Sequence, residues 1–134
     1  MPHRESVLIL QYDHVHLIHS DHDAAVRFYK DILGAAEIGR IERGGAPQTK
    51  MEIGGTILLV RGIRDGEKPM EAGTLPRMGA DHFGFWVGGG EMEEAKGCLK
   101  KAGVRILQEG DVPELRFVYF EGPDGVVIEF MERK

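Results

Sequence analysis

The sequence predicts an α+β protein made of two βαβββ modules, and two observations lead to this fold class. Residues 13–34 and 81–103 both begin with Asp-His, continue with alternating residues and a turn, and then become helical before a glycine. Three short strand-like segments with glycine-rich turns follow each copy. Because a single repeat of this size cannot bury its apolar face alone, we expect the two copies to pack together.

The module boundaries follow from this repeat. We expect the 134 residues to form a single domain (1–134), with the first module over about 11–62, a connection over 63–79 and the second module over about 80–132. The connection is rich in Gly, Pro and charged residues and has no clear period, which is typical of a loop.

Composition limits the classes of partner and location. Hydrophobic residues make up 42% and charged residues 29% of the chain, as in ordinary globular proteins. The formal net charge of -5 gives no reason to expect nucleic acid as a partner. No apolar run approaches the roughly 20 residues that span a bilayer, so we expect no membrane partner and no signal peptide. The single cysteine suits a reducing compartment, and we expect a cytoplasmic protein.

The first strand of each module shows the same alternation. In the first copy, Val15 and Leu17 share one strand face, and His14 and His16 share the other. In residues 82–87 the aromatic pair of Phe residues takes one face, while the histidine and the tryptophan take the other. We therefore expect the apolar set to pack on the following helix and the histidine set to point away from it.

A helix follows each of these strands. Apolar residues recur at helical spacing over 24–33, with Asp21 or Asp23 as the N-cap and Gly34 just past the end. The second helix is expected from about residue 91 to 102, because its acidic start and basic end complement the helix dipole. Cys98 lies within this second helix, and we expect it to be structural.

Short strands then complete each module. The Gly44-Gly45 and Gly54-Gly55 pairs are typical of two-residue hairpin turns, and the sequence Gly-Pro-Asp-Gly at 122–125 predicts a turn before the last strand. The expected strands cover about 36–43, 48–53 and 56–62 in the first module, and about 104–108, 115–121 and 126–132 in the second.

Two of the six histidines are equivalent in the repeat. We expect His3 to lie in a frayed N-terminus, and His19 and His22 to be surface or capping residues. His14 and His82 occupy the same position in the two modules, so pseudo-twofold pairing of the modules would bring them together.

A carboxylate completes a ligand set. Ile128 and Phe130 share one face of the last strand, which leaves Glu129 on the other. An acid in an apolar strand is costly to bury unless it is paired or bound to metal. Two imidazoles and one carboxylate form a facial ligand set with open positions. The alternative is a pair of hydrogen-bonded strand histidines and a glutamate at a wet sheet end, but the repeat favours the metal site.

The chain resembles a known family, the vicinal oxygen chelate superfamily, over about residues 11–132. This superfamily includes glyoxalase I, methylmalonyl-CoA epimerase, fosfomycin-resistance thiol transferases, extradiol dioxygenases and bleomycin-resistance proteins. The resemblance is carried by residues 13–15, 24–34, 82–85 and 119–129, which contain FYxxxLG- and PDGxxxE-type patterns. It implies that His14, His82 and Glu129 bind one divalent metal ion, for which Fe, Mn, Ni, Co and Zn all suit the ligands.

One departure from the family pattern concerns a fourth ligand. Members with four protein ligands carry Glu or Gln on the last strand of the first module, and we align that position with Leu58. Leucine cannot bind a metal, so the glyoxalase I mechanism is not expected, unless Glu52 on the preceding strand substitutes.

Further residues are expected to line the site. His16 shares the parity of His14, roughly 7 Å along the strand, and is a candidate general base or hydrogen-bond donor, or else a solvent-facing histidine. Tyr119 is a second catalytic candidate, because related enzymes carry a functional tyrosine at a similar place; the alternative is a core tyrosine with its hydroxyl at the rim. Trp86 and Met131 are expected to form apolar wall, and the candidate handles for an anionic substrate are Arg61, Arg64, Arg77 and Arg116.

These residues together predict a metal-dependent enzyme acting on a small-molecule substrate. Its metal would chelate two neighbouring oxygens and stabilise an enolate or oxyanion, with a lyase- or isomerase-like reaction slightly preferred. The alternatives are an Fe(II) ring-cleaving dioxygenase and a metal-free protein that sequesters a small molecule. The resemblance also implies a homodimer, in which the modules can pair within one chain or between two.

Overall fold

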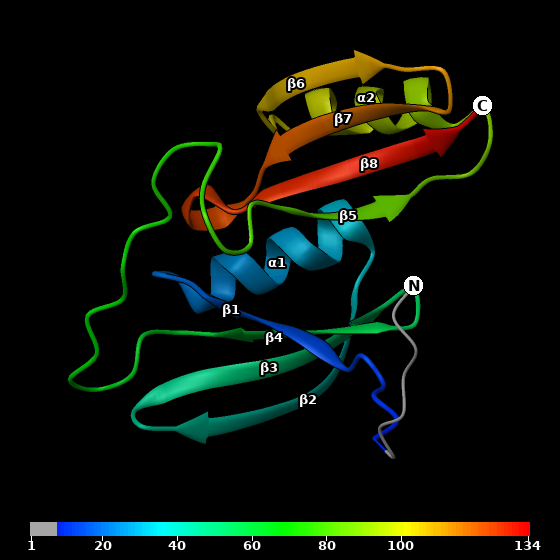
Figure 1. Cartoon of the computed structure of the whole chain (residues 1–134). Helices are drawn as coiled ribbons and strands as arrows, with labels where there is room; N and C mark the ends of the chain where they lie inside the picture. The colour runs from blue at the N-terminus through cyan, green and yellow to red at the C-terminus, as the bar shows by residue number, and fades with distance from the viewer. Residues whose placement is uncertain (1–7) are drawn as a thin grey trace.

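The structure, a computed structural model, describes residues 8–134, so His3 lies outside the described residues. The first module comprises β1 (His14–Ile18), α1 (His22–Leu33), β2 (Ala36–Arg43), β3 (Ala46–Ile53) and β4 (Thr56–Arg61). The second comprises β5 (Phe83–Trp86), α2 (Met92–Lys101), β6 (Ile106–Asp111), β7 (Leu115–Glu121), the short 3₁₀ turn η1 (Pro123–Gly125) and β8 (Val127–Arg133) (Figure 1). This order confirms the expected α+β fold of two βαβββ modules. Neither described helix is long and apolar enough to cross a membrane.

Each module forms its own four-stranded mixed sheet. The strand order is β1-β4-β3-β2 in the first sheet and β5-β8-β7-β6 in the second, so the two sheets have equivalent topology. The strands β1 and β4 are parallel, as are β5 and β8, and all other neighbouring strands are antiparallel. In both modules the helix carries the chain from one edge strand of the sheet to the other.

Glycine turns set the strand boundaries of the first module. Gly44 and Gly45 have φ values of 60° and 80°, and Gly54 and Gly55 have values of 55° and 82°. Two successive positive φ values are typical of a type I′ hairpin turn, as the sequence predicts. Because this turn lets pairing begin at once, β3 starts at Ala46, two residues before the expected start.

The N-terminus of each helix is bonded to a carboxylate, which is adjacent in sequence for α1 and distant in sequence for α2. Asp21 is the N-cap of α1, and its Oδ1 accepts a hydrogen bond from the backbone N of Ala24 at 3.0 Å. Gly34 ends this helix with φ 70°. The N-terminus of α2 is different, because its Met92 N donates to Oε2 of the buried Glu132 on β8 at 2.9 Å. A carboxylate at this position also complements the helix dipole.

One hydrophobic core joins the two modules. Figure 1 shows α1 lying between the two sheets, with α2 packed on the second sheet. The buried cluster includes Tyr29 of α1 and Leu58 of β4 together with Phe120 of β7 and Ile128 of β8. We call the side of each sheet that faces away from this core its open face. The histidine set of each module, with His14 in the first and His82 in the second, lies on the open face, as the alternation in the sequence predicts.

The two histidines expected at the surface are buried instead. His19 is 1% exposed, and its Nδ1 lies 2.9 Å from Asp124 Oδ2 while its Nε2 lies 2.9 Å from the Tyr29 hydroxyl. His22 is 6% exposed and contacts Thr49 through Nε2 at 2.7 Å. The surface prediction was wrong because the contacts come from residues distant in sequence: Asp124 of the η1 turn for His19, and Thr49 of β3 for His22.

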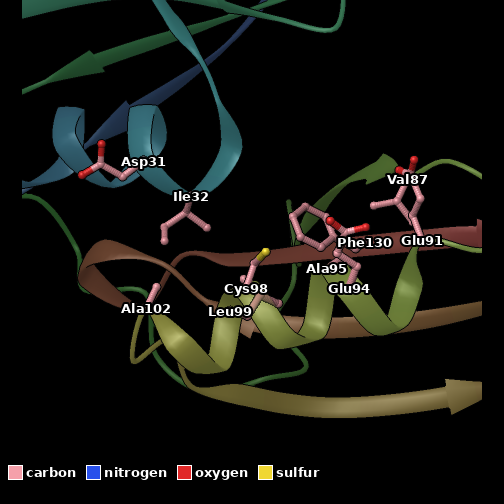
Figure 2. Close-up of a pocket in the computed structure, with 10 residues that line it drawn as sticks. All are labelled: Asp31, Ile32, Val87, Glu91, Glu94, Ala95, Cys98, Leu99, Ala102 and Phe130. Carbon is pink, nitrogen blue, oxygen red and sulfur yellow. The ribbon is translucent and has the colours of Figure 1, made fainter.

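A cavity of about 350 Å³ separates the two helices (Figure 2). Asp31 and Ile32 of α1 line one side of it, and α2 lines the other. Cys98 faces this cavity and is exposed, so the expectation of a structural role in packing is not supported. The cavity contains none of the side chains that the sequence predicts to bind metal.

Candidate metal centre

His82 and Glu129 come together on the open face of the second sheet. Parallel pairing sets Gly84 beside Glu129, and His82 directly precedes β5. As a result His82 Nε2 lies 3.1 Å from Glu129 Oε1. Two ligand atoms about 2.1 Å from a metal ion and at right angles around it are about 3.0 Å apart. The spacing of this pair therefore fits two adjacent positions in one coordination sphere.

The other ring nitrogen of His82 is also held by a carboxylate. Asp81 Oδ2 lies 2.7 Å from His82 Nδ1, and this hydrogen bond holds the pKa of Asp81 below its ordinary value. An ionised carboxylate only accepts hydrogen bonds, and a neutral imidazole has one N–H. In a neutral ring whose Nδ1–H donates to Asp81, Nε2 is the lone-pair nitrogen, and it lies beside Oε1 of Glu129.

The same orienting carboxylate is repeated in the first module. Asp13 Oδ2 lies 2.7 Å from His14 Nδ1, the same spacing as in the second module. A carboxylate on the second nitrogen commonly fixes the tautomer of a metal-binding histidine and makes it a better ligand. We did not assign a role to Asp13 or Asp81 from the sequence, although the repeated Asp-His pair was the available signal.

His14 itself lies on the open face of the first sheet, apart from His82 and Glu129. In residues 8–134, no group of three or more His, Cys, Asp and Glu side chains is placed to hold a metal ion within one chain. The structure thus brings two of the three expected ligands together and leaves the third on the other module.

The position of the missing fourth ligand has to be corrected. Leu58 is fully buried in the core, on the face opposite to His14. The pairing of Gly84 with Glu129 in the second sheet corresponds to the pairing of His16 with Leu59 in the first. Leu59 is therefore the equivalent of Glu129, and it cannot bind metal either. Our alignment was displaced by one residue, which in a strand changes the face.

Glu52 shares the open face with His14 through its partner Ile57. Its Oε1 accepts a hydrogen bond from the Gly55 backbone N at 3.0 Å, so the carboxylate closes the β3–β4 turn. This contact gives Glu52 a structural role, and its role as a metal ligand stays a prediction.

His16 is held by a hydrogen-bonded chain on the same face. Arg61 Nε donates to His16 Nε2 at 2.8 Å, and Glu67 accepts from both terminal nitrogens of Arg61 at 2.6 and 3.0 Å. Burial, followed by the charge of Arg61, lowers the pKa of His16, and the hydrogen bond from Arg61 lowers the pKa of Glu67 to about 2. Because arginine only donates, Nε2 of His16 is an acceptor and the proton of the neutral ring is on Nδ1.

Tyr119 lies beside the His82–Glu129 pair. Its ring centroid is 4.6 Å from that of His82 and 5.2 Å from that of Phe117, and it pairs with Glu129 across the β7–β8 ladder. Burial raises the pKa of Tyr119, and the negative charges of Glu129 and Asp81 raise it further. The hydroxyl therefore remains protonated at neutral pH and can donate a hydrogen bond.

The other residues that the sequence predicts to line the site lie on different faces of the second sheet. Trp86 is exposed on the open face, with the Arg133 guanidinium 3.8 Å above its ring, and Met131 pairs with it across the β5–β8 ladder. Arg116 lies within 3.6 Å of carboxylate oxygens of Asp111 and Glu132, on the core side of β7. Arg116 is therefore not placed to bind a substrate at the predicted site.

Comparisons with known proteins place this arrangement in a family. The sequence model of one protein family, the Glyoxalase/Bleomycin resistance protein/Dioxygenase superfamily, matches residues 11–130 of the chain. A comparison with curated protein sequences gives no significant match.

Solved structures share the fold. A glyoxylase/bleomycin resistance protein/dioxygenase domain from Frankia sp. EAN1pec has a TM-score of 0.79 at 23% identity, covering 95% of this chain and 94% of that chain. A glyoxalase family protein from Enterococcus faecalis has a TM-score of 0.75 at 22% identity, covering 91% and 97%. A variant of the fosfomycin resistance protein FosX from Listeria monocytogenes, complexed with Mn(II) and 1S,2S-dihydroxypropylphosphonic acid, has a TM-score of 0.72 at 20% identity, covering 92% of each chain. The family match over most of the chain confirms the resemblance, and this protein belongs to the Glyoxalase/Bleomycin resistance protein/Dioxygenase superfamily.

Proposed function

We propose that the chain is an enzyme that uses one divalent metal ion to bind two neighbouring oxygens of a small-molecule substrate. The observation that carries this proposal is the contact of His82 with Glu129. The Nε2 atom of His82, whose other nitrogen is held by Asp81, faces a carboxylate oxygen at 3.1 Å. The donor set of imidazole and carboxylate suits Mn, Fe, Co, Ni or Zn.

The third ligand in this proposal is His14 of a second copy of the chain. The open faces of both sheets expose apolar side chains, with Ile18 37%, Ile41 44% and Trp86 45% exposed. In a homodimer the open face of the first sheet of one copy would cover the open face of the second sheet of its partner. Such pairing supplies the third ligand and buries these side chains, as isologous dimers commonly do.

The metal, when bound, would act as a Lewis acid toward negative charge that develops on the substrate oxygens. Tyr119 would donate a hydrogen bond from its protonated hydroxyl to the substrate beside His82. His16 would offer its Nδ1–H in the same way, since Arg61 occupies its Nε2. These two proton carriers lead us to favour a lyase- or isomerase-type reaction over ring cleavage by oxygen. The FosX complex, in which Mn(II) accompanies a vicinal diol, supports chelation of neighbouring oxygens.

Metal binding tests this proposal. The protein, purified without chelators and then dialysed against each divalent metal, should retain about one ion per chain by elemental analysis. His82→Ala and Glu129→Gln should lose that ion, whereas the exposed helix variant Glu94→Gln should keep it. Absence of any bindable divalent metal, with no effect of His82→Ala, would contradict the proposal and leave metal-free binding of a small molecule as the function.

A further inference from the structure

A second cavity lies on the open face of the second sheet, next to the proposed metal site. It has a volume of about 370 Å³ and is covered by residues 73–77 of the connection between the modules. Tyr119 forms part of its wall, and the ring of this same tyrosine is 4.6 Å from that of His82. A cavity of this size can hold a small organic group. A molecule bound to the metal could therefore extend past Tyr119 into this space.

Arg77 brings a positive charge to this cavity. Its backbone N donates to Asp81 Oδ1 at 2.9 Å, and its Nη2 donates to the carbonyl oxygen of Gly125 at 3.0 Å. These two contacts fix the arginine between the residue that orients His82 and the η1 turn. The guanidinium is thus held in place before any ligand arrives.

The donors of Arg77 are not all used. Its Nε is buried and has no hydrogen-bond partner in residues 8–134. Buried donors in folded proteins almost always have a partner, so this N–H is left to a water molecule or a ligand. A guanidinium has five N–H donors, and among residues 8–134 only the carbonyl oxygen of Gly125 accepts from that of Arg77.

The charges that line the cavity do not balance. Arg105 and Arg77 both line it, against the single carboxylate of Glu121. Glu121 Oε2 lies 3.9 Å from Arg105 Nη1, so this pair accounts for one arginine. Arg77 forms no ion pair within the part of the chain that the structure describes. Asp81 lies near Arg77, whose charge helps to lower the pKa of that carboxyl, but Asp81 does not line the cavity.

We propose that this cavity binds a carboxylate of the substrate, with Arg77 as the residue that recognises it. The inference rests on the proposed function and sharpens it, because the substrate would be a small acid that carries two neighbouring oxygens as well as the carboxylate. A planar carboxylate matches the fork of a guanidinium, which can donate two parallel hydrogen bonds to its two oxygens. Gln108, which pairs with Tyr119 across the β6–β7 ladder, adds a further polar group to the wall.

The first test uses metal-free protein and benzoate as the probe. Titration with benzoate should shift the Nε–Hε NMR signal of Arg77 until it saturates, whereas the neutral benzamide and the dianion phenylphosphonate should bind at least about tenfold more weakly. Arg77→Met should abolish benzoate binding, and Arg77→Lys should weaken it while keeping the charge. Arg64→Met is the matched control, because Arg64 also has a buried Nε without a partner. Unchanged benzoate binding in Arg77→Met, or its loss in Arg64→Met instead, would overturn the assignment.

The second test separates this inference from the proposed function. With Zn(II)-loaded protein, 3,4-dihydroxybenzoate should bind about tenfold more tightly than catechol, which has the same neighbouring oxygens but no carboxylate. In Arg77→Met the two affinities should become equal, with that for catechol unchanged. Equal affinities in the unaltered protein would contradict the carboxylate subsite alone. If neither diol binds, chelation fails, and the benzoate titration still decides the role of Arg77.

Discussion

The open faces of the two sheets have the same strand order and register but carry different chemistry. On the second sheet, Glu129 lies opposite Gly84, and His82 precedes them. On the first sheet, Leu59 lies opposite His16, and His14 precedes them. The histidine oriented by an aspartate is present on both faces, but the carboxylate that completes a ligand pair is present on only one.

This difference indicates that the two copies of a duplicated module can contribute different groups to one site. In the proposed site, the second sheet would supply two ligands and the Tyr119 hydroxyl, and so most of the metal's coordination sphere. The first sheet offers one histidine, and its neighbouring His16 is bound to Arg61 and turned toward hydrogen-bond donation. In the proposed site the two faces would complement each other, because together they would supply all three ligands.

The largest effect is expected from the unequal pair Glu129 and Leu59. Glu129→Ala should weaken metal binding by about 100-fold to 1,000-fold, because one of three ligand bonds is lost. Leu59→Ala at the equivalent place should change the affinity by less than about twofold, since leucine donates nothing to a metal. Isothermal titration with Zn(II) measures both. Similar losses in the two variants would break the comparison.

A smaller effect is expected from the equal pair Asp13 and Asp81. Replacing either by Asn should lower the metal affinity by about tenfold, since removal of the carboxylate that orients a metal-binding histidine has effects of this order. The same titration applies, with circular dichroism to show that the fold is intact. If Asp13→Asn had no effect while Asp81→Asn did, the first sheet would not contribute a ligand.

A gain is expected from making the two faces alike. Leu59→Glu places a carboxylate where the second sheet has Glu129, and it should raise metal affinity by about fivefold if the first sheet faces the metal. Leu59→Gln, which adds bulk and polarity without charge, serves as the matched control. A lower affinity in Leu59→Glu than in Leu59→Gln would show that this position points elsewhere.

The smallest effect concerns the contact that joins the modules. Burial lowers the pKa of His19 below 6.5, and Asp124 partly opposes this by its hydrogen bond and charge. The unfolded chain therefore takes up a proton that the folded chain does not, so this histidine makes stability fall as the pH drops below about 6.5.

Asp124→Asn should lower the free energy of unfolding by about 1 kcal/mol at pH 7.5 through a weaker hydrogen bond. It should also steepen the fall in stability from pH 6.5 to 5, because the opposing charge is gone. His19→Gln should remove the part of this fall that His19 contributes. Urea unfolding at pH 7.5, 6.5 and 5.5 measures all three proteins, and a steeper fall in His19→Gln than in the unaltered chain would contradict the assignment.

The fold and half of the site could be predicted because their signals are local. The Asp-His repeat, the glycine pairs and the alternation around Glu129 each depend on residues adjacent in sequence. The burial of His19 could not be predicted in the same way, since its partner Asp124 lies 105 residues away. The choice of Leu58 over Leu59 depended on strand register, which pairing between β1 and β4 settles and a single sequence does not.

In the proposed site one metal ion is held by His14 of one chain and by His82 and Glu129 of another, and a mixing experiment tests this arrangement most directly. His14→Ala and His82→Ala proteins should each fail to hold metal. Unfolded together in equal amounts and refolded, half of the dimers should be mixed, and each mixed dimer should have one intact site, so that about one site in four binds metal. Recovery of about a quarter of the metal content of the unaltered protein is the result that we predict. No recovery in the refolded mixture, with dimers formed, would contradict a site shared between chains.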